Sequence, residues 1–254
     1  MYSIGIIALN TFRENLRDKI LYNLLLFAGL LIAASLLLAS LSMGEHQKIV
    51  ADMGLAAINL IGVMIAVFVG IGLVTKEIDR RTIYTVMARP ISRAQFLIGR
   101  YLGLVLTLSV NLAIMLVVFL AVLWMVRVSP HMSLLQAIEL IYVELLVVTA
   151  VALFFSTFSS AMVSASLTVG LYVIGHLTQD LKGLAEKGEN EFLTALLTVV
   201  YYLVPNLEKL NIKGQAAAGV SISLTYQAMA TVYGLFYASL LIAAACMIFQ
   251  RRDF

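Results

Sequence analysis

The side chains that most often perform chemistry are few and scattered in this sequence. The single cysteine is Cys246. The three histidines, His46, His131 and His176, stand far apart near the ends of apolar runs, where a water-exposed interfacial side chain is expected rather than a ligand or a base. One cysteine excludes a disulfide framework, and no Cys/His cluster has the spacing of a structural zinc site. The G-x-S-x-G and H-E-x-x-H motifs are also missing, so a hydrolase that acts within a membrane has no support.

Glu144 is the carboxylate that stands deepest in an apolar run, about halfway along residues 134–156. An unpaired carboxylate at bilayer depth costs several kcal/mol, so Glu144 is expected to face the bundle interior, another subunit or a water-filled cavity. Two interpretations stay open: a residue of a transport pathway, or a neutral packing residue hydrogen-bonded to Asn59 or Asn111. Neither Glu144 nor Glu139, which is expected at the interface, has a basic partner visible within a span.

The most polar internal stretch, residues 76–97, holds the second group of candidate residues. Apolar residues recur there at helical spacing from Ile78 to Met87, and Pro90 follows. This pattern predicts a short amphipathic helix that ends before the proline. The alternative is a solvated basic loop.

The composition places all of these residues in a membrane protein. Of the 254 residues, 62% are hydrophobic and only 12% are charged, far from the balance of a soluble domain. A span takes about 20 apolar residues, so six spans use about half of the chain. The sequence therefore predicts an all-α polytopic membrane protein with one transmembrane domain over residues 1–254. The net charge of +3 gives no support for nucleic acid binding.

The apolar runs predict six transmembrane helices, at about 20–42, 53–75, 98–126, 134–156, 161–177 and 229–249. Residues 1–19 alternate charged and apolar faces, as an interfacial helix does, and the run that follows them is too long for a signal peptide. Within the long segment 178–228, the apolar stretch Phe192 to Val204 is too short to cross a bilayer and stops at Pro205. It predicts a re-entrant or interfacial helix, with a seventh span as the weaker alternative.

The basic residues predict the orientation. Eleven Lys and Arg lie at the N-terminus, the 76–100 region and the C-terminus, whereas the opposite side has two outside the long 178–228 segment. Cytoplasmic loops carry the excess of Lys and Arg, and long loops count little. Both termini and residues 76–97 are therefore expected in the cytoplasm, and 178–228 outside.

Several of these features together resemble a known family. They are an acidic residue with Thr82 five positions later, an apolar helical run, Pro90-Ile-Ser-Arg93, Ile98-Gly99-Arg100, a Pro205-Asn206 element and a terminal Phe-x-Arg-Arg-Asp. The pattern is similar to the transmembrane permeases of ATP-binding-cassette (ABC) exporters of the type 2 (ABC-2) family, in a type V exporter-like form. One difference is that Arg81 stands where the family often has glycine before the threonine.

The resemblance implies that the cytoplasmic helix is a coupling helix that docks on a separate ATPase subunit. The residues implied in this contact are Glu77, Asp79, Arg80, Arg81, Thr82, Tyr84 and Arg89. No Lys is followed by Ser or Thr, so the chain has no Walker motif, and ATP and Mg would be bound by the partner subunit. The implied complex has two ATPase subunits and a second permease, identical or homologous, in a bacterial-type inner (cytoplasmic) membrane.

The expected function is ATP-driven export of an amphipathic, lipid-like or peptide-like substrate, with no cofactor or metal in this chain. An ion-coupled secondary transporter is the alternative. Such transporters place coupling charges at the midplane of broken helices and often contain internal repeats. One midplane carboxylate and no evident repeat favour the ABC exporter.

Overall fold

The computed structural model describes residues 2–40, 46–79, 92–128, 131–187 and 191–251. Every regular element in these ranges is a helix, so the all-α fold class is confirmed. In chain order the helices are α1 (Tyr2–Leu16), α2 (Lys19–Ser40), α3 (His46–Asp79), α5 (Arg93–Met125), α6 (Met132–Ser156), α7 (Ala161–His176), α8 (Thr178–Lys187), α9 (Glu191–Leu203), the 3-10 helix η1 (Leu207–Leu210), α10 (Lys213–Ala217) and α11 (Leu224–Arg251).

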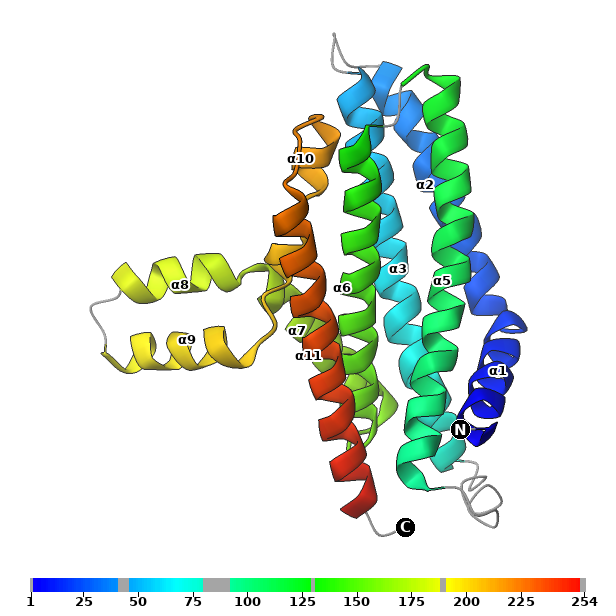
Figure 1. Ribbon diagram of the computed structural model, residues 1–254, viewed down its shortest axis with the longest axis vertical. Coiled ribbons are helices and arrows are strands. Elements are labelled where there is room, and N and C mark those ends of the chain that lie inside the picture. The colour runs from blue at the N-terminus through cyan, green and yellow to red at the C-terminus, as the bar shows by residue number, and fades with distance from the viewer. Residues whose placement is uncertain (1, 41–45, 80–91, 129–130, 188–190, 252–254) are drawn as a thin grey trace.

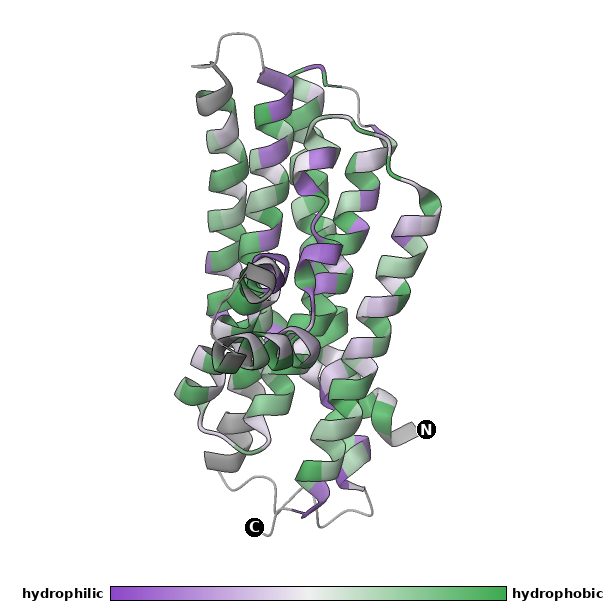
Figure 2. Ribbon diagram, turned by 90° about the vertical axis from the view of Figure 1, so that its left-hand side faces the viewer, coloured by the Kyte–Doolittle hydropathy of each residue, from purple (hydrophilic) through white to green (hydrophobic). Residues whose placement is uncertain are grey.

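Five of the described helices, α2, α3, α5, α6 and α11, are long and apolar enough to cross a membrane. A sixth span results only if α7 and the first turns of α8, which meet at an angle of 63°, count as one broken span. With 16 residues, α7 alone is about 24 Å long, which is shorter than the roughly 30 Å hydrocarbon core. Hydrophobic residues cover most of the length of the long helices (Figure 2).

The central pair of the bundle is α3 and α6. In each, 78% of the most apolar window is buried inside the protein, against 22% for α2 and 28% for α11. Small residues bring the pair together: a Cβ at Gly62 would lie 2.6 Å from Leu145, and one at Gly70 would lie 3.4 Å from Ala152. Helices α2, α5, α7, α10 and α11 pack against this pair, so a polar group on its facing sides is shielded from lipid.

The helices extend past several of the predicted spans. The second span was predicted at 53–75, but α3 runs from His46 to Asp79; the third was predicted from residue 98, but α5 begins at Arg93; and the last was predicted from residue 229, but α11 begins at Leu224. A helix can continue beyond the hydrocarbon, because its backbone groups are bonded within the helix. Residues 46–52, which precede the predicted second span, therefore belong to α3.

The first turn of α5, the C-terminal ends of α3, α6 and α11, and helix α1 all lie at one end of the bundle (Figure 1). We call this the inner end, because the distribution of Lys and Arg predicts that it faces the cytoplasm. Helices α8 and α9 pack against each other and project sideways from the bundle, between its two ends (Figure 1). The apolar stretch predicted as a re-entrant or interfacial helix forms α9, and α8 precedes it as an additional helix.

Candidate coupling end and buried polar cluster

Most of the residues predicted to contact an ATPase lie outside the described residues. They are Arg80, Arg81, Thr82, Tyr84 and Arg89. Glu77 and Asp79 belong to the last turn of α3. The described structure therefore shows the two helices that flank the predicted coupling segment, α3 before it and α5 after it.

A capping box fixes the start of α5. The backbone N–H of Gln95 donates to Oγ of Ser92, and the backbone N–H of Ser92 donates to Oε1 of Gln95, both at 3.2 Å. These two bonds satisfy donors that a helix N-terminus otherwise leaves open. The serine of the Pro-Ile-Ser-Arg motif thus defines where the helix begins.

The arginine of the same motif joins α5 to the end of α11. Nη1 of Arg93 donates to the carbonyl oxygens of Phe249 (3.4 Å) and Gln250 (3.2 Å). Beside this contact the rings of Phe96 and Phe249 stack, with centroids 6.4 Å apart. A cation at the last carbonyls of a helix is favourable, because those groups lack intrahelical partners. The first turn of α5 and the last turn of α11 are therefore held together.

Helix α1 lies directly against α5 through two glycines. A Cβ at Gly99 would lie 2.8 Å from Ile7, and one at Gly103 would lie 2.5 Å from Cβ of Thr11 and 2.7 Å from the carbonyl oxygen of Ala8. Such approaches leave no space for any other residue type. We call this contact the α1–α5 seam.

Arg100 closes the seam with a buried charge. Only 6% of Arg100 is exposed, and its Nη1 donates to Oγ1 of Thr11 (3.2 Å) and to Oε2 of Glu14 (3.1 Å). Its guanidinium also lies over the ring of Phe96, 5.4 Å from the centroid. One turn further, Nδ2 of Asn15 donates to Oγ1 of Thr107 at 2.9 Å, although Asn15 was not singled out in the sequence.

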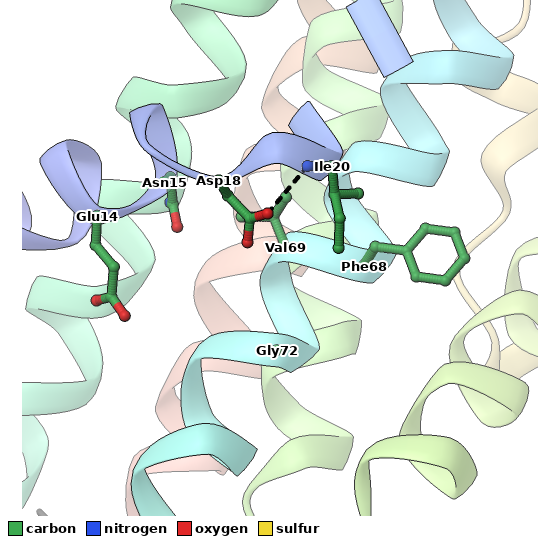
Figure 3. Close-up of a pocket in the computed structure, with 7 residues that line it drawn as sticks. All are labelled: Glu14, Asn15, Asp18, Ile20, Phe68, Val69 and Gly72. Atoms are coloured by element: carbon green, nitrogen blue, oxygen red, sulfur yellow. Dashed lines mark hydrogen bonds between the residues drawn. The ribbon is translucent and has the colours of Figure 1, made fainter. Parts of the chain in front are cut away.

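A cavity of about 130 Å³ lies where α1 turns into α2, against α3 (Figure 3). Oδ1 of Asp18 accepts a hydrogen bond from the backbone N–H of Ile20 at 3.0 Å and so caps the start of α2. The cavity combines carboxylates of the α1–α2 junction with an apolar wall on α3. Its lining residues are Glu14, Asn15, Asp18, Ile20, Phe68, Val69 and Gly72.

The second candidate site surrounds Glu144, which is 0% exposed in the centre of α6. Nδ2 of Asn59 on α3 donates to both carboxylate oxygens, at 3.2 and 3.4 Å. Nε2 of His176 on α7 lies 3.4 Å from Oε1 of Glu144. The hydroxyl of Tyr172 donates to Oδ1 of Asn59 at 3.2 Å. Three helices thus converge on one carboxylate, and we call these four residues the Glu144 cluster.

The cluster corrects two interpretations of the sequence. Glu144 was expected to have no basic partner, and His176 was expected to be a wetted residue at a span end, but the two side chains face each other. Lys213 at the start of α10 also lies close enough to interact electrostatically with Glu144. A sequence signal existed: Tyr172 and His176 are four residues apart, so they share one face of a helix.

Asn111, the other predicted partner of Glu144, does not contact it. Nδ2 of Asn111 donates to the carbonyl oxygen of Thr107 in its own helix at 2.7 Å. Glu139, which was expected at the interface, accepts hydrogen bonds from Nε2 of Gln227 and from Oγ1 of Thr231, the latter at 3.0 Å. Glu139 therefore joins α6 to α11 rather than contributing to the Glu144 cluster.

Three tyrosines of α11 hold the irregular backbone that contains Pro205 and Asn206. Tyr237 donates to the carbonyl oxygen of Leu203 (2.6 Å), Tyr226 donates to that of Lys209 (2.9 Å), and Tyr233 accepts from the N–H of Asn206 (2.8 Å). Irregular backbone at membrane depth is tolerated only where protein or water satisfies its polar groups. The tyrosine hydroxyls satisfy polar backbone groups from the end of α9 through η1.

These features define a multi-pass, all-helical membrane protein whose helices are joined at one end by arginine contacts and at mid-height by a buried polar cluster. Residues 7–254 match the family described as ABC-2 family transporter protein, and the chain belongs to this family. It is therefore the membrane component of an ABC transporter, a transmembrane subunit rather than the catalytic ATPase, and such subunits generally pair with an ATPase subunit. No match was found among curated proteins.

Proposed function

We propose that this chain is the permease subunit of an ATP-driven exporter and that a separate nucleotide-binding subunit drives it through residues 77–89. The observation that carries the proposal is the connection of α5, whose start follows the coupling segment, to two other helices at the inner end. Arg93 bonds α5 to α11, and Arg100 bonds it to α1. A displacement of the coupling segment would thus move several helices together.

The absence of a Walker motif supports an external source of ATP hydrolysis, because no Lys in the sequence is followed by Ser or Thr. In the proposed complex, two ATPase subunits bind ATP and Mg. Two permeases, identical or homologous, lie between them in a bacterial-type inner membrane, with both termini cytoplasmic. The substrate is an amphipathic molecule, lipid-like or peptide-like, since the apolar faces of the bundle offer it a path along the bilayer.

The proposal is tested by replacing Arg81 and Tyr84 with alanine. Arginine and aromatic residues are the usual anchors of interfaces, and truncating one commonly costs at least 1–2 kcal/mol of binding. Tagged wild-type and variant chains are purified from native membranes, and bound ATPase activity is measured per permease. We expect at least a tenfold weaker retention of the ATPase by the double variant.

The matched control is Lys182→Ala with Tyr202→Ala, which also removes one basic and one aromatic side chain, both exposed and on α8 and α9. This control should retain the ATPase as the wild type does. Equal retention by the Arg81/Tyr84 variant would contradict the proposed coupling segment. Substrate movement that needs an ion gradient and no ATP would support the ion-coupled alternative instead.

A further inference from the structure

The break between α7 and α8 lies beside a pair of ionisable side chains, one fully buried and one partly buried. His176 is the last residue of α7, and the chain then turns by 63° into α8. His176 faces Glu144 of α6, at 3.4 Å between Nε2 and Oε1. The side chain of His176 is 19% exposed and that of Glu144 is 0% exposed. His176 therefore lies between a fully buried carboxylate and the edge of the bundle.

The contacts of the imidazole determine where its hydrogen lies. Nδ1 of His176 lies 3.1 Å from the carbonyl oxygen of Tyr172. A carbonyl oxygen can only accept, so Nδ1 carries a hydrogen and donates it. In the neutral ring the other nitrogen, Nε2, then has none. That nitrogen is buried, has no hydrogen-bond partner of good geometry and faces the carboxylate.

The Asn59 amide cannot supply the missing hydrogen between Nε2 and Oε1. Its Nδ2 donates to the carboxylate of Glu144, and its Oδ1 accepts from the hydroxyl of Tyr172. Without a further proton, a lone pair of His176 would face a lone pair of an ionised Glu144. Desolvation makes that arrangement costly at bilayer depth.

One added proton between Nε2 of His176 and the carboxylate of Glu144 removes the repulsion between the two lone pairs. It gives either an imidazolium beside a carboxylate or a neutral imidazole beside a carboxylic acid, and the pair is neutral in both forms. The other charged group that acts on Glu144 among the described residues is Lys213 of α10, and α3 contributes the uncharged Asn59. The positive charge of Lys213 opposes a second proton, which would give the pair a net positive charge.

We propose that Glu144 and His176 form a proton-binding site that holds one shared proton and thereby locks the end of α7 to α6 and α3. The site lies within this chain and does not need the ATPase subunit, so its test does not depend on the proposed function. Any conformational change that moves α7 away from α6 must first separate the two groups that share the proton.

The experiment compares the unfolding equilibrium of the purified chain, in mixed micelles between pH 7 and pH 8, with that of a Glu144→Gln/His176→Gln variant. Free histidine and glutamate lose their protons at about pH 6.5 and 4.3, so the unfolded pair holds about a quarter of a proton at pH 7 and almost none at pH 8. If the folded pair holds one, unfolding releases a proton and stability falls as pH rises. The unfolding constant of the wild type should increase up to tenfold more per pH unit than that of the variant.

A matched control carries the same two substitutions elsewhere, Glu139→Gln with His131→Gln, and should keep the wild-type slope. Equal slopes in the wild type and the Glu144/His176 variant would overturn the proposal. If that variant does not fold, ¹⁵N-histidine spectra of the wild type at pH 8 decide the question. Free imidazole in the same micelles at pH 8 serves as the reference for the neutral ring. A His176 Nε2 signal displaced from that reference supports a shared proton, and a coincident signal excludes it.

Discussion

The α1–α5 seam and the Glu144 cluster both bury polar side chains, but they balance them in different ways. At the seam, the buried guanidinium of Arg100 reaches Glu14, whose side chain is 54% exposed. In the middle of the bundle, Glu144 is 0% exposed and meets an amide and an imidazole. The buried charge of Arg100 is balanced by a carboxylate that stays largely exposed, whereas the fully buried Glu144 is balanced by hydrogen bonds from an amide and, as proposed above, by a proton shared with His176.

The two regions also differ in what gives them their geometry. The seam depends on shape, because Gly99 and Gly103 bring two helix backbones together and leave no space for a side chain. Close backbone approach at small residues is a main source of helix association in lipid. The Glu144 cluster depends on hydrogen bonds between side chains from three helices. Steric changes should therefore disrupt the seam most, and changes of polarity should disrupt the cluster most.

The largest loss of stability is expected for Gly103→Leu. Its Cβ alone would lie 2.7 Å from the carbonyl oxygen of Ala8, which belongs to the backbone and cannot rotate away. Overpacking costs up to about 3 kcal/mol, and here α1 must also separate from α5. Thermal or denaturant unfolding of the purified chain measures the loss. Gly5→Leu, at a position in α1 with nothing within 4 Å, is the matched control. Equal stability of the two variants would show that shape does not hold the seam.

A smaller loss, about 2 kcal/mol, is expected for Glu144→Leu. Leucine cannot accept the amide hydrogens of Asn59, and it leaves Nε2 of His176 facing an apolar group. Each buried group left without a partner costs about 1 kcal/mol or more. Glu144→Gln keeps an acceptor for Asn59 and should cost less than half as much. The same unfolding assay compares them, and equal losses would mean that packing rather than hydrogen bonding gives the cluster its stability.

The sequence predicted the parts of these regions that have local signals. The apolar run predicted from residue 98 lies within α5, which begins five residues earlier at Arg93, and the apolar stretch ending at Pro205 predicted α9 almost to its ends. Asn59 was one of two proposed partners of Glu144, because a buried carboxylate needs an amide or a hydroxyl nearby. These inferences used only the residue types and their spacing along the chain.

The contacts that sequence reasoning missed join residues far apart in the chain. Arg100 and Glu14 are 86 residues apart, and no pattern in either segment identifies the other. His176 was placed at a wetted span end because residues 161–177 were treated as a complete span. The break after α7 instead ends that helix beside the central pair, where the histidine meets Glu144. Which polar residues meet is decided by where a helix stops, and composition alone does not specify this.

The smallest loss of stability is expected for a substitution of Arg93, which lies at the inner end but outside the α1–α5 seam. A cation in the first turn of a helix is unfavourable to that helix, yet Arg93 donates to carbonyls in the last turn of α11, where a cation is favourable. Arg93→Met keeps most of the aliphatic stem and removes the two bonds. It should therefore cost about 0.5–1 kcal/mol.

The loss should be local. Amide hydrogen exchange in the last turn of α11 should accelerate several-fold in Arg93→Met, while exchange in the middle of α6 stays unchanged. Arg251→Met, which removes an exposed arginine from the same turn of α11, controls for the loss of charge. If the Arg251 variant accelerates exchange as much as the Arg93 variant does, then general electrostatics rather than the bridge from α5 holds the end of α11. Each helix at the inner end would then be held separately, and a displacement of α5 would not move α11.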